Sequence, residues 1–201
     1  MVIFRPLLVF TITSLMACSA SAAPNQNPPP EEKFSAFQVF EMAPIEIPAK
    51  QRDKDRAIDA AQKIVFAINK KVGSQLTSWT KNTPQARTLL IEPQIEDLKV
   101  VNGATRFFAG PFAGSSRVTM KVKFTDKATG KVIAEPQFYQ QANAMAGAMS
   151  VGGADNAMLY RIGSLIGTYI ETNYSDTVGG ATTNEASDDM PAPDGPTGKV
   201  E

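Results

Sequence analysis

The stretch Arg117-Val-Thr-Met-Lys-Val-Lys-Phe-Thr125 decides the predicted fold, because apolar and polar residues alternate through it without a break. This period of two is typical of a strand with one face in a core and the other in water. The turn-forming stretch Asp126-Lys-Ala-Thr-Gly130 follows, and Lys131 to Phe138 then runs back. The pattern predicts an antiparallel hairpin whose buried face carries Val118, Met120, Val122 and Phe124.

Upstream and downstream of the hairpin, apolar residues recur at steps of three and four, which is the period of helices. From Asp53 onward this spacing predicts an amphipathic helix of more than about 20 residues, with Asp53 as its N-cap. Asp59 and Lys63 have the spacing of a favourable i,i+4 ion pair. A second helix is predicted to start at a cap formed by Asp155 or Asn156 and to end near residue 173.

Two further strands complete the predicted sheet. The apolar run between residues 34 and 47, closed by Pro48, predicts a strand with an irregularity near Pro44. Arg87 to Val101 predicts another strand, with a bulge before Leu98. The expected fold class is α+β: a two-layer sandwich with a mainly antiparallel sheet of about four strands and two long helices packed on one face.

Composition excludes several classes of function. The 201 residues are 43% hydrophobic and 20% charged, which suits one globular domain with appendages. The chain has no histidine, so an imidazole base, a Ser-His or Cys-His nucleophile and a His-ligated metal are all excluded. The net charge of zero offers no electrostatic footprint for nucleic acid. We expect neither a cofactor nor a metal.

The N-terminus has the pattern of a secretory signal peptide: one positive charge at Arg5, then a mostly apolar stretch that is too short to be a permanent membrane span. Leu15-Met-Ala-Cys18 resembles the bacterial lipoprotein box, whose cysteine is diacylated and becomes the new N-terminus. Ser19, in place of Asp, resembles lipoproteins that are sorted to the outer membrane. The alternative is ordinary cleavage after Ala22 or Ala23, which would discard Cys18.

The predicted domain organisation follows from these shifts in composition. Residues 1–17 are the lipoprotein signal peptide, and 18–33 are the lipidated cysteine and a Pro-rich tether that reaches up to ~45 Å at about 3.1 Å per residue. A Pro-rich ligand for a partner domain is an alternative for this tether. Residues 34–174 form the αβ domain, and 175–201, rich in Gly, Pro and acidic residues, form a disordered acidic tail.

The predicted sheet can gather one cluster of carboxylates, formed by Glu92, Glu96 and Asp97. Two carboxylates can carry out glycoside hydrolysis or bind a hard cation. Side chains alternate along a strand, however, so Glu96 and Asp97 are expected to face opposite ways. Together with Arg106 they remain candidates for a small-ligand site or an enzyme active site.

The element order and two stretches support a family resemblance. VTMKVKFTDKATGKVIAE (118–135) and GGADNAMLYRIGSLIGTYIETN (152–173) resemble a family of bacterial outer-membrane lipoproteins known only as a domain of unknown function. More distantly, the layout is similar to the periplasmic αβ domains of the curli secretion lipoprotein CsgG and of TolB. The resemblance implies a fold and a location, and it implies no active site.

These observations lead to a prediction of a non-enzymatic binding or assembly module. We expect it to be anchored to the outer membrane by acyl chains on Cys18, to face the periplasm and to have an envelope protein as its partner. The alternative is a small-ligand-binding protein or an enzyme that uses Glu92, Glu96 or Asp97 with Arg106.

Overall fold

The structure, a computed structural model, describes residues 25–81, 83–101, 114–142 and 153–184. Cys18, Arg106, residues 143–152 and the tail after Asn184 lie outside this part of the chain, so the expectations for them stay predictions. Within the described residues, no helix is both long enough and apolar enough to cross a membrane.

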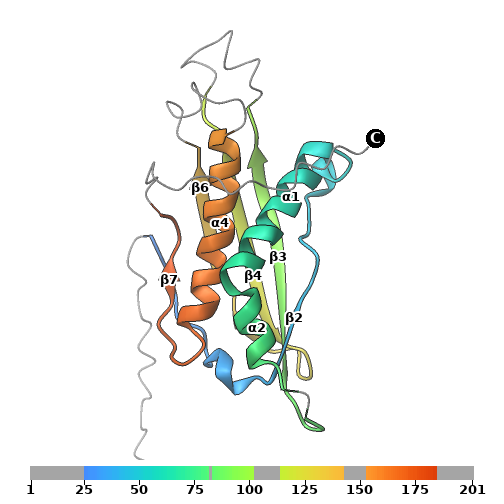
Figure 1. The fold of residues 1–201 in the computed structure, drawn as a ribbon, viewed down its shortest axis with the longest axis vertical. Helices are drawn as coiled ribbons and strands as arrows, with labels where there is room; N and C mark the ends of the chain where they lie inside the picture. The colour runs from blue at the N-terminus through green and yellow to red at the C-terminus, as the bar shows by residue number, and fades with distance from the viewer. Residues whose placement is uncertain (1–24, 82, 102–113, 143–152, 185–201) are drawn as a thin grey trace, which may run out of the picture.

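The predicted hairpin forms the centre of a five-stranded sheet (Figure 1). Its long strand is β4, Arg117–Asp126, and the returning chain forms β5, Val132–Ala134, and β6, Gln137–Gln141, which both pair antiparallel with β4. On its other side, β4 pairs antiparallel with β3, Thr88–Lys99, which in turn pairs parallel with the edge strand β2, Val39–Met42. The sheet is therefore mainly antiparallel, as predicted.

The turn after β4 forms as its residues predict. Gly130 has a positive φ of 72°, a conformation that glycine adopts without steric cost. Its N–H donates to the Asp126 carbonyl at 2.8 Å, and the Asp126 carboxylate accepts the Ala128 N–H at 3.0 Å. The side chain of Asp126 thus stabilises the turn that its backbone begins.

Both long helical segments cover the same face of the sheet (Figure 1). The first runs through α1, Asp55–Ile68, a π-helical turn η3, Asn69–Gly73, and α2, Ser74–Trp79. The second is α4, Gly153–Thr172. Two short 3₁₀ turns, η1 at Phe34–Ala36 and η2 at Ala49–Gln51, connect the segments around β2. The predicted two-layer α+β sandwich is confirmed.

The helix starts differ from the predictions. Lys54, not Asp53, is the N-cap of α1, because its N–H donates to the Gln51 carbonyl at 3.0 Å and leaves Asp53 in the turn that follows η2. α4 already begins at Gly153, so Asp155 lies in its first turn, where a carboxylate is favourable beside the positive end of the helix dipole. The predicted Asp59–Lys63 ion pair is present, at 2.7 Å.

The core lies between the sheet and the helices and matches the alternation of β4. Val122 and Phe124 are fully buried, whereas the Lys121 and Lys123 side chains, on the opposite face, are 30% and 43% exposed. The Phe34 ring stacks on Phe124 with the ring centroids 4.8 Å apart. The predicted buried and exposed faces of the central strand are therefore confirmed.

The folded domain extends beyond both boundaries expected from composition. The strand β1, Gln26–Asn27, pairs antiparallel with β7, Gly180–Ala181, so residues expected in the tether and in the tail belong to the fold. Buried Asn173 explains the second extension, because its side-chain amide donates to the Gly179 carbonyl and its oxygen accepts the Gly179 N–H, both at 2.8 Å. Composition contains no information about such hydrogen bonds, so it predicted that both ends are unstructured.

The close approach of α4 to α1 depends on Gly163. A Cβ atom at this position would lie 2.5 Å from the Ala67 Cβ and 2.8 Å from the Ile64 carbonyl oxygen. One is a backbone oxygen and the other is a Cβ atom bonded directly to the backbone, so neither can move unless α1 moves. The two helices therefore pack at a distance that only glycine allows.

We expect Gly163→Ala to lower the free energy of unfolding by about 1–3 kcal/mol, the usual cost of overpacking. Gly73→Ala is the matched control, because its backbone is helical and its nearest neighbour, the Asn69 Cβ, lies 3.6 Å away. That control should be neutral or stabilising, since alanine is a better helix former by about 0.5–1 kcal/mol. Urea denaturation followed by circular dichroism measures both, and equal midpoints for the two variants would contradict the packing argument.

Candidate functional site

No described helix or strand covers the face of the sheet opposite the helices, and this face is charged. We call it the open face and define it by the side chains of β3 and β4 that point away from α1 and α4. Opposite charges meet between neighbouring strands of this face: Glu92 lies directly opposite Lys123 in the β3–β4 ladder, and other pairs form diagonally or with the chain after β5. The Arg117 Nε lies 2.8 Å from the Asp97 carboxylate, and the Lys121 Nζ lies 2.9 Å from Glu135, just after β5.

A bulge in β3 places two candidate carboxylates on the same face. The register shifts between Ile95 and Asp97, which leaves Glu96 as the extra residue and confirms the predicted bulge before Leu98. Glu96 accepts a hydrogen bond from the Gln137 side chain at 3.3 Å, and Asp97 pairs with Arg117, so both carboxylates point to the open face. The prediction that they face opposite ways was wrong, because the bulge interrupts the alternation on which it relied.

The three candidate carboxylates nevertheless do not converge. Glu92 accepts the Thr125 hydroxyl at 3.1 Å and lies 4.0 Å from the Lys123 Nζ. Glu96 and Asp97 have their own, different partners, as described above. The described residues contain no group of acidic or cysteine side chains suited to hold a metal ion. Arg106, the fourth member of the predicted set, lies outside them.

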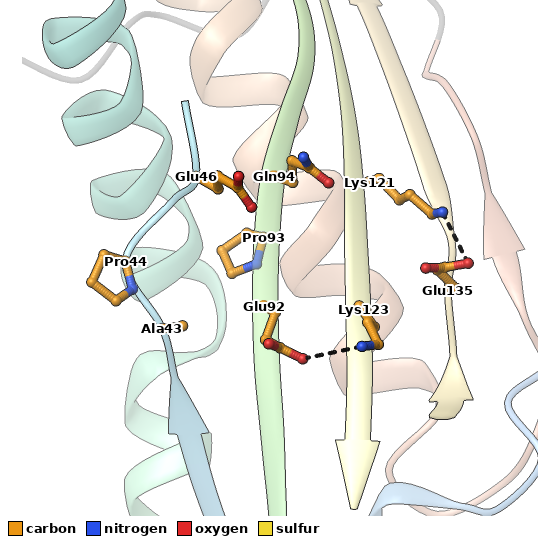
Figure 2. Close-up of a pocket in the computed structure, with 9 residues that line it drawn as sticks. All are labelled: Ala43, Pro44, Glu46, Glu92, Pro93, Gln94, Lys121, Lys123 and Glu135. Carbon is orange, nitrogen blue, oxygen red and sulfur yellow. Dashed lines mark ion pairs between the residues drawn. The ribbon is translucent and has the colours of Figure 1, made fainter. Parts of the chain in front are cut away.

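A break in the β2–β3 ladder creates a hollow in the open face. Pro93 lies inside β3, where proline is normally excluded because it cannot donate a ladder hydrogen bond. β2 has ended at this level, and Pro44 lies beside Pro93 (Figure 2). The ladder resumes when the Glu46 N–H donates to the Pro93 carbonyl at 2.9 Å. The predicted irregularity near Pro44 is thus confirmed, and Pro93 is tolerated because its nitrogen meets this gap.

The hollow has a volume of about 270 Å³ and a mixed-charge lining (Figure 2). Two of its three carboxylates face lysines, Glu92 with Lys123 and Glu135 with Lys121. Glu46, the third, makes no ion pair among the described residues. The hollow, which we call the open-face groove, is lined by Ala43, Pro44, Glu46, Glu92, Pro93, Gln94, Lys121, Lys123 and Glu135.

Sequence reasoning identified Glu92 but missed the rest of this groove. The alternation of β4 already placed Lys121 and Lys123 on the wet face, which was the available signal. Nothing in the sequence shows that Glu46 returns to pair beside Gln94 after the break. The groove combines two lysine–glutamate ion pairs with one carboxylate, that of Glu46, which can accept hydrogen bonds. Such a lining can contact a polar surface.

A second charge cluster lies at the end of the sheet where β3 begins and β4 ends. The Arg87 guanidinium donates to the buried Asp126 carboxylate through Nη2 at 2.8 Å and Nε at 3.2 Å. It also donates to Glu32 at 2.9 Å and lies over the Phe37 ring, 4.3 Å from its centroid. Hydrogen bonds from Arg87 hold the pKa values of Glu32 and Asp126 below their ordinary values of 4.5 and 3.8. This cluster fixes the N-terminal segment to the sheet.

These lowered pKa values predict the pH dependence of stability. A carboxylate whose pKa is lower in the folded state contributes stability above its unfolded-state pKa and loses it as the pH falls through the folded-state value. We therefore expect the urea midpoint to decrease below pH 4.5, and to decrease less steeply in Arg87→Met. At pH 7 this variant should lose about 1–3 kcal/mol, because hydrogen bonds to charged groups are removed.

Arg52→Met is the control for this series, because Arg52 is exposed on the turn after η2. Its midpoint should follow the wild-type pH curve. If Arg87→Met instead shows the same pH slope as the wild type, the Arg87 cluster is not the source of the acid sensitivity.

The fold and the open face define a two-layer α+β domain with one sheet face that no described segment covers. The chain belongs to the DUF4410 family, a domain of unknown function, whose family model matches residues 19–148. No protein of curated function matches the chain. The predicted family of unknown function is confirmed, while the distant similarity to CsgG and TolB stays a prediction.

Several solved structures are similar in fold. The PelC dodecamer from Paraburkholderia phytofirmans is 10% identical, with a TM-score of 0.43 over 76% of this chain and 96% of that chain. Protein CT253 from Chlamydia trachomatis is 15% identical, with a TM-score of 0.42 over 68% and 98% of the two chains. A candidate lipoprotein from Caulobacter crescentus CB15 is 11% identical, with a TM-score of 0.35 over 71% and 90%. At these identities and TM-scores the likenesses carry no argument about function.

Proposed function

We propose that the protein is a lipid-anchored, non-enzymatic binding or assembly module that faces the periplasm from the outer membrane and binds an envelope protein through its open face. The observation that carries this proposal is the sheet face left uncovered by the described part of the chain, where strands hold charges of both signs around the open-face groove. The lipoprotein box at Leu15–Cys18 supports the anchor and the location.

The arrangement of the charges favours binding over catalysis. Paired catalytic carboxylates have to flank one scissile bond, whereas Glu92, Glu96 and Asp97 each contact a different partner side chain. Paired surface charges contribute little to stability, but they give orientation and specificity when a complementary surface displaces water from them. Strands hold these side chains at fixed spacings, so the open face can recognise a partner by its charge pattern.

The geometry gives little support to the alternative of a small-ligand site or an enzyme active site. Of its candidates among the described residues, only Glu92 lines the groove, while Glu96 and Asp97 do not. The groove volume of about 270 Å³ lies just below the roughly 300–1,000 Å³ of typical small-molecule pockets. A protein surface, which needs no deep cavity, fits this face better.

Site-specific photocrosslinking in intact cells tests the proposal. A photoreactive amino acid at exposed Gln94, in the groove, should give a discrete adduct with an envelope protein, which mass spectrometry then identifies. The same amino acid at Gln62, exposed on α1 and on the opposite layer, is the matched control and should not give this adduct. Combining the Gln94 probe with Lys121→Glu and Lys123→Glu should abolish it.

Two results would contradict the proposal. One is an absence of Gln94 adducts while the full-length protein is present at its normal level. The other is an identical set of adducts from Gln62, because contact would then not depend on the open face.

A further inference from the structure

The first described residues are fixed to the domain. The Asn25 carbonyl accepts the Thr182 N–H at 2.9 Å, one residue before the β1–β7 pairing begins. The buried Asn27 side chain then both donates to the Gln137 carbonyl and accepts the Gln137 N–H, each at 2.8 Å. These paired bonds tie the N-terminal segment to β6 as well as to β7.

The following proline-rich residues are fixed as well. The Tyr169 hydroxyl, in α4, donates to the Pro28 carbonyl at 3.0 Å, and burial raises the pKa of this hydroxyl, which keeps it protonated as a donor. Pro30 is buried, and the Glu31 N–H donates to the Ile133 carbonyl at 2.8 Å. The run of prolines is therefore part of the domain surface and does not act as a spacer.

This arrangement shortens the connection to Cys18. Six residues, 19–24, separate the cysteine from Asn25, and whatever their conformation the Cα atoms of Cys18 and Asn25 can lie at most about 25 Å apart. The 12 residues of β3 alone extend about 40 Å. An anchor at Cys18 would thus hold Asn25 within about 25 Å of the lipid, which is less than the length of β3.

The surface around Asn25 is chemically distinct from the open face. Residues 25–30 and 177–184, which contain β1 and β7, include no Asp, Glu, Lys or Arg, and we call them the uncharged edge. Val178, within this edge, is 61% exposed, the highest exposure of any large apolar side chain in the described residues. Figure 1 shows β7 at one side of the molecule and β2 at the other.

We infer that the uncharged edge rests on the phospholipid surface, so that the sheet stands on the membrane and the open face remains accessible from the side. This inference depends on the proposed anchor at Cys18. The residues of the edge carry no carboxylate that anionic headgroups would repel, and the exposed apolar side chain of Val178 can enter the interface. Two exposed carboxylates border the edge: Glu31, which pairs with Lys131, and Asp176. The short connection and the chemistry of the edge point to the same contact.

Fluorescence quenching from the lipid headgroups tests this orientation. The full-length acylated protein, in vesicles of phosphatidylethanolamine and phosphatidylglycerol that include a nitroxide-headgroup lipid, carries a fluorophore on Val178→Cys or on Glu46→Cys. Acylation blocks Cys18, so the introduced thiol is the only one available. Glu46, exposed beside β3 beyond the end of β2, is the control, about 19 Å from β7 at the usual strand spacing.

We expect several-fold stronger quenching at Val178 than at Glu46. Insertion of about 20 Gly and Ser residues after Ala22 should reduce this difference, because the longer flexible chain lets the domain leave the surface.

Equal quenching at both positions in the acylated protein would overturn the orientation alone. Self-quenching at Val178 that rises with protein density, without lipid quenching, would assign the edge to a second copy and also overturn it. An absence of acyl mass on Cys18 would overturn the anchor itself, and with it this inference.

Discussion

Val122→Asp is expected to unfold the domain. Val122 is fully buried at the centre of β4, opposite Pro93 in the ladder and on the helix-covered face of the sheet. Burying a carboxylate without a partner costs several kcal/mol, which is comparable to the ~5–15 kcal/mol of stability that a typical domain has. The variant should lose its cooperative thermal transition, followed by circular dichroism.

Gln94→Asp is the matched control for this result. It introduces the same carboxylate into the same sheet, but at an exposed position opposite Lys121. Its free energy of unfolding should stay within about 0.5 kcal/mol of the wild type. An unchanged melting temperature in Val122→Asp would contradict the assigned core face, and a collapse of both variants would show that the sheet tolerates no new charge on either side.

The central sheet could be predicted from sequence because its signals are local. The alternation of β4 determines which side chains are buried, and the Asp126 to Gly130 turn fixes the direction of the returning chain. The two ends of the domain could not be predicted, because single side chains, Asn27 and Asn173, anchor them by hydrogen bonds to backbone groups. The Asn27 bond joins residues 110 positions apart and the Asn173 bond spans only six, but neither leaves a periodic pattern in the sequence.

The candidate site was predicted only in part, for a related reason. The bulge in β3 was expected, yet its effect on the directions of Glu96 and Asp97 depends on the register between two strands. The groove exists because Pro44 and Pro93 meet at a gap in the β2–β3 ladder, and each proline alone indicates only an irregular strand. Individual residues were therefore identifiable, but their arrangement was not.

Cys18→Ala is expected to abolish acylation completely, which is the largest effect on location that we predict. Cys18 is the single cysteine of the chain and follows Leu15-Met-Ala17, so no other residue can accept the lipid of this pathway. Each buried methylene contributes about 0.8 kcal/mol, so two or three acyl chains anchor a protein essentially permanently, whereas one would leave it exchanging. The variant should accumulate as a precursor held by its own apolar segment, or be cleaved later and released to the periplasm.

Metabolic labelling with a tagged fatty acid, combined with membrane fractionation, measures this outcome. Ser19→Asp is the matched control, because it keeps Cys18 and should keep the label, while its resemblance to retained lipoproteins predicts a shift to the inner membrane. Label that persists in Cys18→Ala, or that is absent from the wild type, would show that this cysteine is not the anchor. Because only six residues separate Cys18 from the fixed Asn25, loss of the label should also free the open face from any orientation relative to the membrane. Crosslinking from Gln94 in the Cys18→Ala background would then show whether partner binding requires the anchor or only the domain.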